Sequence, residues 1–462
     1  MDTVPHTSKD KEKILEAIGV SSFEELLTSI PKRLRDFRWD LPCGVSELEL
    51  AAELRGTAVR NTDFTSAVCY LGAGNYDHFI PAVVERLAHR SEFMTSYTPY
   101  QGEASQGTLQ SMYEYQTLIC ELTGMDASNA SMYDGASGLA EAVLLALRSD
   151  GRKKILLPQT VHPEYRAVVR TYLSYVGAEV VEVPALDGAV DLAKLRELLD
   201  GDAAAVVIQQ PNFFGILEDA PEAAEAARKA GAHLIACVNP LSLGILKPPG
   251  EYGADIAVGE GQPLGNAVSY GGPHFGFFAV KEPLLRKIPG RIAGMTVDNA
   301  GRRAFVLTLQ AREQHIRREK ATSNICTNQA LCALKGAIYL ALLGREGIRK
   351  LGLLNVKNAR ETYERLLRIR GVSEFSRKPF FNEFVLYVDR PEEKLKESFR
   401  RNGILGPLPL ARFDARMRSA YLFAVTEKRT PADLDRLVKA IEETKEGDYL
   451  ASTGRGIKQT HF

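Results

Sequence analysis

Five short runs between residues 155 and 258 are apolar at nearly every position, which is too continuous for strands with one face in water. They are Ile155–Leu157, Val180–Val183, Ala205–Ile208, Leu234–Val238 and Ile256–Val258. Helical patterns separate most of them, for example Glu164–Tyr175 and Leu192–Leu199. Strands that are apolar on both faces and joined by helices are typical of a parallel sheet. The sequence therefore predicts an α/β fold with a mainly parallel sheet.

Further elements extend this pattern on both sides. Ser105–Leu122 has an apolar stripe at helical spacing and is followed by Gly124, and Gly138–Arg148 predicts a second helix. Phe275–Val280 and Ala304–Leu309 are expected to add edge or antiparallel strands. Together these segments predict one large α/β domain over residues 61–320.

The pattern changes at both ends of that domain. Apolar residues at helical spacing before Pro31 predict a helical arm over residues 1–60, which either wraps a partner subunit or covers its own domain. Two long helices and a strand–helix–strand–helix set predict a small α+β domain over residues 321–446. These elements are Gln329–Leu343, Leu353–Ile369, Phe384–Val388, Glu393–Arg401, Tyr421–Val425 and Pro431–Thr444. Residues 447–462 are expected to form a polar tail.

Composition excludes several classes of function. Lys+Arg and Asp+Glu are equal at 58 each, so charge gives no argument for binding nucleic acid or an anionic membrane. The six cysteines contain no C-x-x-C pair and predict buried reduced thiols, with neither a disulfide framework nor a metal site. Met1–Lys13 lacks an apolar signal core and no window is long enough to span a membrane, so we expect a cytoplasmic protein.

Two polar segments that precede predicted helices are candidates for binding. Tyr97, Thr98, Pro99, Tyr100 and Gln101 combine two aromatic rings and several hydroxyls with a rigid proline, and could line a small-molecule pocket. The plainer interpretation is a loop capped at Ser105. Thr322, Ser323 and Asn324 could contact a phosphate, including one held by a neighbouring chain, or could simply cap a helix. From composition alone the plainer interpretation is favoured for both segments.

Three smaller features could either bind a ligand or have a purely structural role. The small residues of Tyr133–Gly138 could bind phosphate at a helix N-terminus, or simply begin the helix. His162, after a predicted strand, could stack on a flat ring, or be structural. Gly271 and Gly272 would let the backbone approach either a ligand or a neighbouring strand.

Taken together and in order, these segments resemble the glycine decarboxylase P-protein family of the glycine cleavage system. The resemblance runs over nearly the whole chain. The segments that carry it are Tyr70–Asp77, Tyr97–Gln101 with Ser105–Gly107, Met132–Ser137, Gly253–Gln262, Gly271–Gly276 and Arg318–Thr327. It implies the fold type I architecture of pyridoxal-phosphate (PLP) enzymes. Family members are either one long chain with two homologous halves or two separate subunits, and this chain has the length of one half.

The resemblance also exposes a missing lysine. In the family the second half, or second subunit, holds PLP on a lysine that is followed by a glycine-rich turn. When that turn is placed on Gly271–Pro273, the lysine position falls on Gln262, and the acid that pairs with the cofactor ring falls on Asn239. A Schiff base needs a primary amine, and no lysine occurs between Lys247 and Lys281. This chain therefore resembles the first half standing alone, as subunit 1, with no catalytic residue of its own.

The resemblance implies a division of labour between two chains. A second subunit would hold PLP on its lysine in an α2β2 assembly, decarboxylate glycine and pass the aminomethyl group to the lipoylated H-protein. Tyr97–Gln101 would face the glycine or PLP of that partner, and Thr322–Asn324 would face its phosphate. Gly102 stands where the family usually has proline, which predicts a looser loop.

Two other functions remain open from the residues. One is an autonomous PLP enzyme that uses Lys247, which lies before the second strand, or Lys281, which lies beyond the glycine-rich turn. The other is a regulatory or binding homologue without activity. Drift after loss of a site would also erode polar loops, and the intact segments Tyr97–Gln101 and Thr322–Asn324 favour the half-site interpretation.

Overall fold

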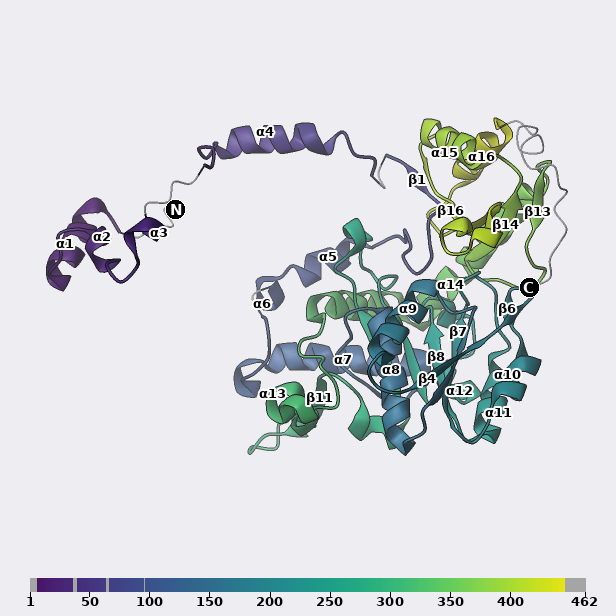
Figure 1. Cartoon of the computed structure of the whole chain (residues 1–462), viewed down its shortest axis with the longest axis horizontal. Coiled ribbons are helices and arrows are strands. Elements are labelled where there is room, and N and C mark those ends of the chain that lie inside the picture. The colour runs from purple at the N-terminus through teal and green to yellow at the C-terminus, as the bar shows by residue number, and fades with distance from the viewer. Residues whose placement is uncertain (1–5, 36–39, 64–65, 95, 445–462) are drawn as a thin grey trace. The chain divides into compact units, whose positions relative to one another are not determined.

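A computed structural model of the chain describes residues 6–35, 40–63, 66–94 and 96–444. The predicted tail over residues 447–462 lies outside them. The chain separates into two compact units, Met1–Thr62 and Asp63–Phe462 (Figure 1). No described helix is long and apolar enough to cross a membrane.

The first unit is helical. Its helices are α1 (Ser8–Ile18), α2 (Phe23–Leu26), α3 (Lys32–Arg35) and α4 (Glu47–Ala58). Thr7 and Ser46 begin α1 and α4 with capping boxes, in which the side chain accepts a backbone N–H of the first turn. None of the residues described in this unit is buried, so apolar side chains such as Phe23 and Leu48 are exposed to solvent.

A seven-stranded sheet forms the centre of the second unit. Its strands, in spatial order, are β2 (Ala127–Ser128), β10 (Gly276–Val280), β9 (Ile256–Glu260), β8 (His233–Val238), β7 (Ala203–Gln210), β3 (Lys154–Pro158) and β4 (Glu179–Val183). The five strands from β9 to β4 run parallel, and β10 pairs antiparallel with both β9 and β2. The predicted mainly parallel α/β sheet is confirmed.

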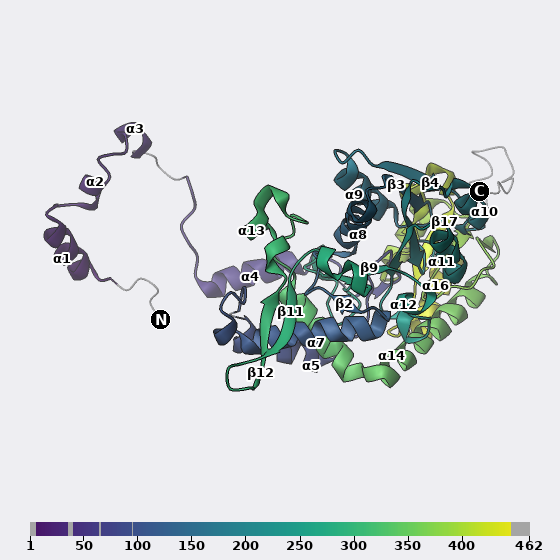
Figure 2. The same cartoon turned by 90° about the horizontal axis from the view of Figure 1, so that it is seen from below.

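Helices cover both faces of this sheet, as Figure 2 shows. They are α8 (Gly135–Asp150) and α9 (Pro163–Leu173) on one face, and α7 (Gln106–Thr123), α11 (Ala220–Lys229) and α14 (Ala330–Leu366) on the other. Successive strand residues point to opposite faces, so Leu156 packs with the second group and Ile155 with the first. Each fully buried side chain of this size contributes about 1.5–3 kcal/mol.

Smaller elements surround the sheet. The helices are α5 (Ala82–Ala88), α6 (Ser91–Met94), α10 (Leu192–Leu198), α12 (Pro249–Tyr252) and α13 (Gln314–Arg317), and the strand pairs are β1 (Val68–Cys69) with β15 (Ile404–Leu405), β5 (Ala185–Leu186) with β6 (Ala189–Val190), and β11 (Ile292–Val297) with β12 (Arg303–Thr308). The strand predicted at Ala304–Leu309 thus pairs antiparallel in a separate hairpin and does not join the large sheet.

The long helix α14 differs from the prediction of two separate helices. The first predicted helix ends at Leu343, and Gly344 breaks the helix there with a φ of 56° and a ψ of −175°. The chain resumes the helix at once, so the predicted gap before Leu353 is wrong. Glycine reaches this left-handed region without the steric cost that a side chain would bring.

A four-stranded antiparallel sheet follows α14. Its strands, in order, are β13 (Val372–Glu374), β14 (Glu383–Val388), β17 (Ala420–Ala424) and β16 (Leu408–Pro409), and α15 (Glu392–Arg401) and α16 (Pro431–Glu442) pack on it.

The cysteines depart in part from prediction, because Cys43 and Cys326 are exposed whereas Cys69, Cys237 and Cys332 are buried.

Candidate functional site

The two positions that the missing lysine drew attention to lie at one edge of the large sheet. Asn239 directly follows β8 and Gln262 lies two residues after β9, and these strands are parallel neighbours. Gln262 is buried, and its amide pairs with the backbone of Tyr76: Oε1 accepts from the N–H at 3.0 Å and Nε2 donates to the C=O at 3.1 Å. Asn239 Oδ1 accepts from the N–H of Leu241 at 3.0 Å. Both side chains are engaged within the chain itself.

The side chain of Tyr76 fills the space beside Asn239. Its hydroxyl donates to Glu383 Oε2 at 2.7 Å and accepts from the N–H of Gly74 at 3.2 Å. The other carboxyl oxygen of Glu383 accepts from the N–H of Ala73 at 2.6 Å. Burial raises the pKa of Glu383 to about 7, although these two hydrogen bonds favour its charged form.

A second carboxylate lies at the N-terminus of α8. Glu260 Oε2 accepts from the N–H of Gly135 at 3.1 Å, and Oε1 accepts from the N–H of Gln262 at 3.0 Å. Burial raises the pKa of Glu260 to about 8, against the lowering effect of these N–H groups. Asp134 caps the same helix by accepting from the N–H of Ser137 at 2.7 Å. At the helix start that could have bound phosphate, carboxylates of this chain therefore accept from the N–H groups of Gly135 and Ser137.

The cavity left among these groups is small, at about 40 Å³. Its lining includes Tyr76, Asn239, Glu260 and Glu383. Pockets for small-molecule cofactors measure about 300–1,000 Å³. The residues present therefore do not fit PLP in this pocket. Neither lysine of the autonomous-enzyme hypothesis reaches it, because Lys247 is exposed and Lys281 Nζ donates to the C=O of Gly124 at 2.8 Å.

His162 stacks on a ring, but the ring belongs to this chain. Its imidazole lies 5.0 Å from the ring of Tyr165, centroid to centroid, at an interplanar angle of 30°. Its Nε2 lies 3.0 Å from the C=O of Ala73. Burial lowers the pKa of His162, which favours the neutral ring. This histidine is a buried structural residue that packs on Tyr165, which lines the small pocket.

The turn at Gly271 and Gly272 uses glycine for its dihedral angles. Their φ values are 97° and 153°, in a region that side-chain-bearing residues rarely adopt. No other part of the described chain comes within 4 Å of the position a Cβ would take on Gly271. Close approach to a neighbouring strand of this chain therefore does not explain it.

The segment Tyr97–Gln101 is turned largely to solvent. Tyr97 and Tyr100 are 78% and 75% exposed, and Gln101 is also exposed, whereas Pro99 is buried and anchors the loop. Thr98 is partly buried, and its Oγ1 has no hydrogen-bond partner in the described structure. Such exposed aromatic side chains on an anchored loop are available to a second molecule.

The loop is held although Gly102 replaces the usual proline. Gly102 lies in a short 3₁₀ turn, and its C=O accepts from Gln106 Nε2 at 2.7 Å. Gln106 also donates to the C=O of Phe305 at 2.8 Å and accepts from its N–H at 2.8 Å. Ser105 precedes α7 but makes no capping hydrogen bond with its side chain. The ordinary capped loop is therefore not what the structure contains.

Thr322, Ser323 and Asn324 line an open cavity of about 950 Å³. They do not cap a helix, because α14 begins only at Ala330. Asn324 is exposed, and Thr322 and Ser323 are half-buried. Charges of both signs line the same cavity: Arg318 lies there with Glu319, and Arg148 lies 3.8 Å from Glu141. Tyr97 lines a different cavity, of about 40 Å³, so this chain by itself does not bring the two segments together.

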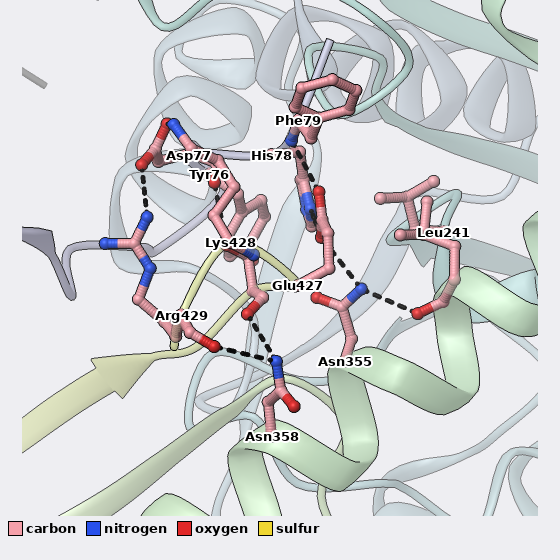
Figure 3. A network of polar contacts seen from close by, with 12 residues as sticks. Tyr76, Asp77, His78, Phe79, Leu241, Asn355, Asn358, Glu427, Lys428 and Arg429 are labelled. Atoms are coloured by element: carbon pink, nitrogen blue, oxygen red, sulfur yellow. Dashed lines mark hydrogen bonds and ion pairs between the residues drawn. The ribbon is translucent and has the colours of Figure 1, made fainter. Parts of the chain in front are cut away.

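A polar network fixes the segment that leads into the pocket (Figure 3). Asp77 pairs with Arg429 at 2.7 Å and with Lys428 at 2.5 Å, and His78 Nδ1 lies 2.8 Å from Glu427 Oε2. The N–H of Phe79 donates to Glu427 Oε1 at 2.6 Å. These contacts hold residues 77–79 against the loop that follows β17.

Sequence reasoning missed the groups that fill the pocket. Tyr76 lies within a motif that carried the resemblance, yet nothing local assigns it a buried place. Glu383 comes 307 residues later in the chain, and Glu260 ends a strand. The one signal of these groups in the sequence was Glu260, a carboxylate two positions before Gln262.

Among the described residues, no three His, Cys, Asp or Glu side chains lie close enough to hold a metal ion.

Sequence comparison places these features in a family. The family described as glycine cleavage system P-protein matches residues 1–441. A probable glycine dehydrogenase (decarboxylating) subunit 1 from Desulfitobacterium hafniense is 51% identical over 446 residues, which cover 96% of this chain and 100% of that protein. The protein of the same name from Carboxydothermus hydrogenoformans is 51% identical over 442 residues, covering 96% and 99%.

Solved structures give the same result. The chain is similar to a crystal structure of glycine decarboxylase (P-protein) of the glycine cleavage system in inhibitor-bound form, with a TM-score of 0.89 and 48% identity over 96% of this chain and 100% of that one. A sphingosine-1-phosphate lyase from Burkholderia pseudomallei shares the fold alone, with a TM-score of 0.62 and 15% identity over 90% and 94%. The predicted fold type I architecture is confirmed. The chain belongs to the glycine cleavage system P-protein family.

Proposed function

We propose that this chain is subunit 1 of glycine dehydrogenase (decarboxylating), and that it completes an active site whose cofactor is held by a second subunit. The observation that carries the proposal is the contrast between its two kinds of polar site. The pocket lined by Asn239 and Glu260 is filled and internally bonded, whereas Tyr97 and Tyr100 are exposed to solvent and Thr322–Asn324 line an open cavity. Relatives at 51% identity are named as this subunit.

In this proposal the chain binds and positions. Bound PLP, on the lysine of the partner, would supply the electron sink for loss of CO2 from glycine. The hydroxyl of Thr322 would donate to the phosphate of that cofactor, with Arg318 favouring its charge, and Ser323 would join it by exchanging its hydrogen bond to Glu141 for one to the phosphate. The exposed rings of Tyr97 and Tyr100 would cover the substrate and exclude water from it.

The partners follow from the same division of labour. A lysine-bearing subunit 2 would join this chain in an α2β2 assembly, and the lipoylated H-protein would receive the aminomethyl group. Mixing the two purified subunits with PLP and reducing with borohydride tests this arrangement: the reduced cofactor should be covalently fixed on subunit 2 alone. A fixed cofactor on this chain would contradict the proposal.

The cytoplasmic location stays a prediction, which cell fractionation tests.

Replacing Thr322 by alanine is expected to weaken PLP binding by the assembled enzyme about 10- to 100-fold, which is the effect of losing one hydrogen bond to a charged group. Tyr100→Phe is expected to lower glycine–bicarbonate exchange with little effect on PLP binding, because it keeps the ring that covers the substrate and removes a hydroxyl that would hydrogen-bond to it. The measurements are a PLP titration by absorbance and the exchange rate at saturating PLP.

Matched control substitutions exist on the surface of this chain. Thr171 is exposed and its hydroxyl donates to the C=O of Ala167, and Tyr175 is fully exposed. Thr171→Ala and Tyr175→Phe should leave PLP binding and exchange unchanged. Wild-type exchange and PLP binding in both Thr322→Ala and Tyr100→Phe would show that the site assignment is wrong.

A further inference from the structure

We infer that this chain excludes PLP by filling its own cofactor pocket, with Tyr76 in the place of the pyridine ring and Glu260 in the place of the phosphate. The absence of a lysine is then only one of the reasons why this chain does not bind PLP. The inference concerns this chain alone and does not depend on the proposed function.

The phenol of Tyr76 occupies the space between the two positions that would hold a cofactor ring. Its backbone N–H and C=O are bonded to the amide of Gln262, which stands at the lysine position. Its ring lies in the pocket beside Asn239, which stands at the position of the ring-pairing acid. Only 6% of the residue is exposed. A second flat ring therefore cannot enter while Tyr76 is in place.

Glu260 occupies the anion site at the start of α8. The first N–H groups of a helix attract negative charge, and a phosphate is a common ligand there. Here the N–H of Gly135 is bonded to Glu260, and Asp134 takes that of Ser137. A Cβ on Gly135 would lie 2.5 Å from the hydroxyl of Tyr165 and 2.8 Å from the backbone nitrogen of Glu260. The backbone and side chains thus close the space that a phosphate would need.

The remaining volume shows how complete the filling is. About 40 Å³ is left, which is space for about one water molecule. The filling groups also bind to one another, because Glu383 accepts from Tyr76 and from Ala73. Residues 77–79 are held from the other side by Glu427, Lys428 and Arg429 (Figure 3). The groups that fill the pocket are therefore held in place by hydrogen bonds and ion pairs within this chain.

Two sets of substitutions in the isolated full-length chain separate the absence of lysine from the filling. The restored variant, Asn239→Asp with Gln262→Lys, supplies the missing chemistry only. The emptied variant adds Tyr76→Ala and Glu260→Ala. Each is incubated with PLP, reduced with borohydride and analysed for a covalent adduct by mass spectrometry, with pyridoxamine phosphate fluorescence as a readout that needs no Schiff base.

We expect no site-specific adduct at position 262 in the restored variant, and both an adduct at that position and pyridoxamine phosphate binding in the emptied one. A site-specific adduct of equal yield in the restored variant would overturn the inference, because the absence of lysine would then suffice. A folded emptied variant that binds neither ligand would overturn it as well.

A single substitution decides the matter if the emptied variant does not fold. Tyr76→Ala leaves a hole with the shape of a phenol beside Glu383, which can accept from the hydroxyl of an added phenol, and cavities made by truncation bind small aromatic molecules. We expect p-cresol to raise the melting temperature of Tyr76→Ala, but not that of the wild type or of Tyr76→Phe. Equal effects on all three proteins would overturn the assignment of the ring position.

Discussion

Replacing Tyr76 by alanine is expected to lower the free energy of unfolding of this chain by about 3–5 kcal/mol, as is typical when a buried aromatic ring is removed. The ring is almost wholly buried, and its hydroxyl is the hydrogen-bond donor to Glu383 Oε2. Truncation therefore creates a cavity and also leaves a buried carboxyl oxygen without that partner. Urea denaturation followed by circular dichroism measures the loss.

Two further substitutions divide this effect into its parts. Tyr76→Phe keeps the ring and removes the hydroxyl, which donates to Glu383 and accepts from the N–H of Gly74, so a smaller loss of about 1.5–3 kcal/mol is expected. Tyr175→Ala removes a fully exposed tyrosine ring and should change stability by no more than about 0.5 kcal/mol. If Tyr76→Ala proves no more harmful than Tyr175→Ala, the phenol does not fill the pocket.

The large sheet could be predicted from the sequence because its signal is local. Each central strand is an apolar run, and burial on both faces leaves little choice of structure. All five predicted runs lie within β3, β4, β7, β8 and β9. The break in α14 falls at Gly344, where the first of the two predicted helices ended.

The content of the pocket could not be predicted, because its signal is not local. Tyr76 and Glu383 are 307 positions apart, and neither belongs to an apolar pattern that requires burial. Burying a polar group is tolerated only where a partner arrives from elsewhere in the fold. Only the three-dimensional structure shows that partner. The sequence showed that Gln262 stands at the lysine position, but it did not show which groups fill the space beside it.

The same limit applies to the candidate segments. Thr322–Asn324 was expected to lie directly before a helix, and capping was the plainer explanation. In the structure α14 begins at Ala330, so capping does not explain these residues. The hydroxyls and Arg148, which is remote in sequence, line one cavity only because α8 packs beside this segment.

The network around Glu427 is expected to stabilise the chain nearly as strongly as the filled pocket. The side chain of Glu427 is only 9% exposed and accepts from the N–H of Phe79 and from Asn355 Nδ2, at 2.6 Å and 3.2 Å, and its Oε2 lies 2.8 Å from His78 Nδ1. Hydrogen bonds to a charged group contribute about 1.5–3 kcal/mol each, so loss of the carboxylate in Glu427→Ala should lower the free energy of unfolding by about 3–5 kcal/mol. Urea denaturation at neutral pH measures it.

Glu427→Gln provides the pH test of this network. Burial by itself raises the pKa of Glu427, but the hydrogen bond and charge of His78 and the N–H of Phe79 outweigh it and lower the pKa from 4.5 to about 2. Below pH 4.5 the unfolded chain therefore takes up the proton first, and the stability that the carboxylate provides is lost as the pH falls toward 2. Glutamine cannot titrate, so the advantage of the wild type over Glu427→Gln should be full at about pH 6 and should shrink steadily from about pH 4.5 to about pH 2.5. A difference between the two proteins that stays constant over this range would show that the carboxylate is not held in its charged form.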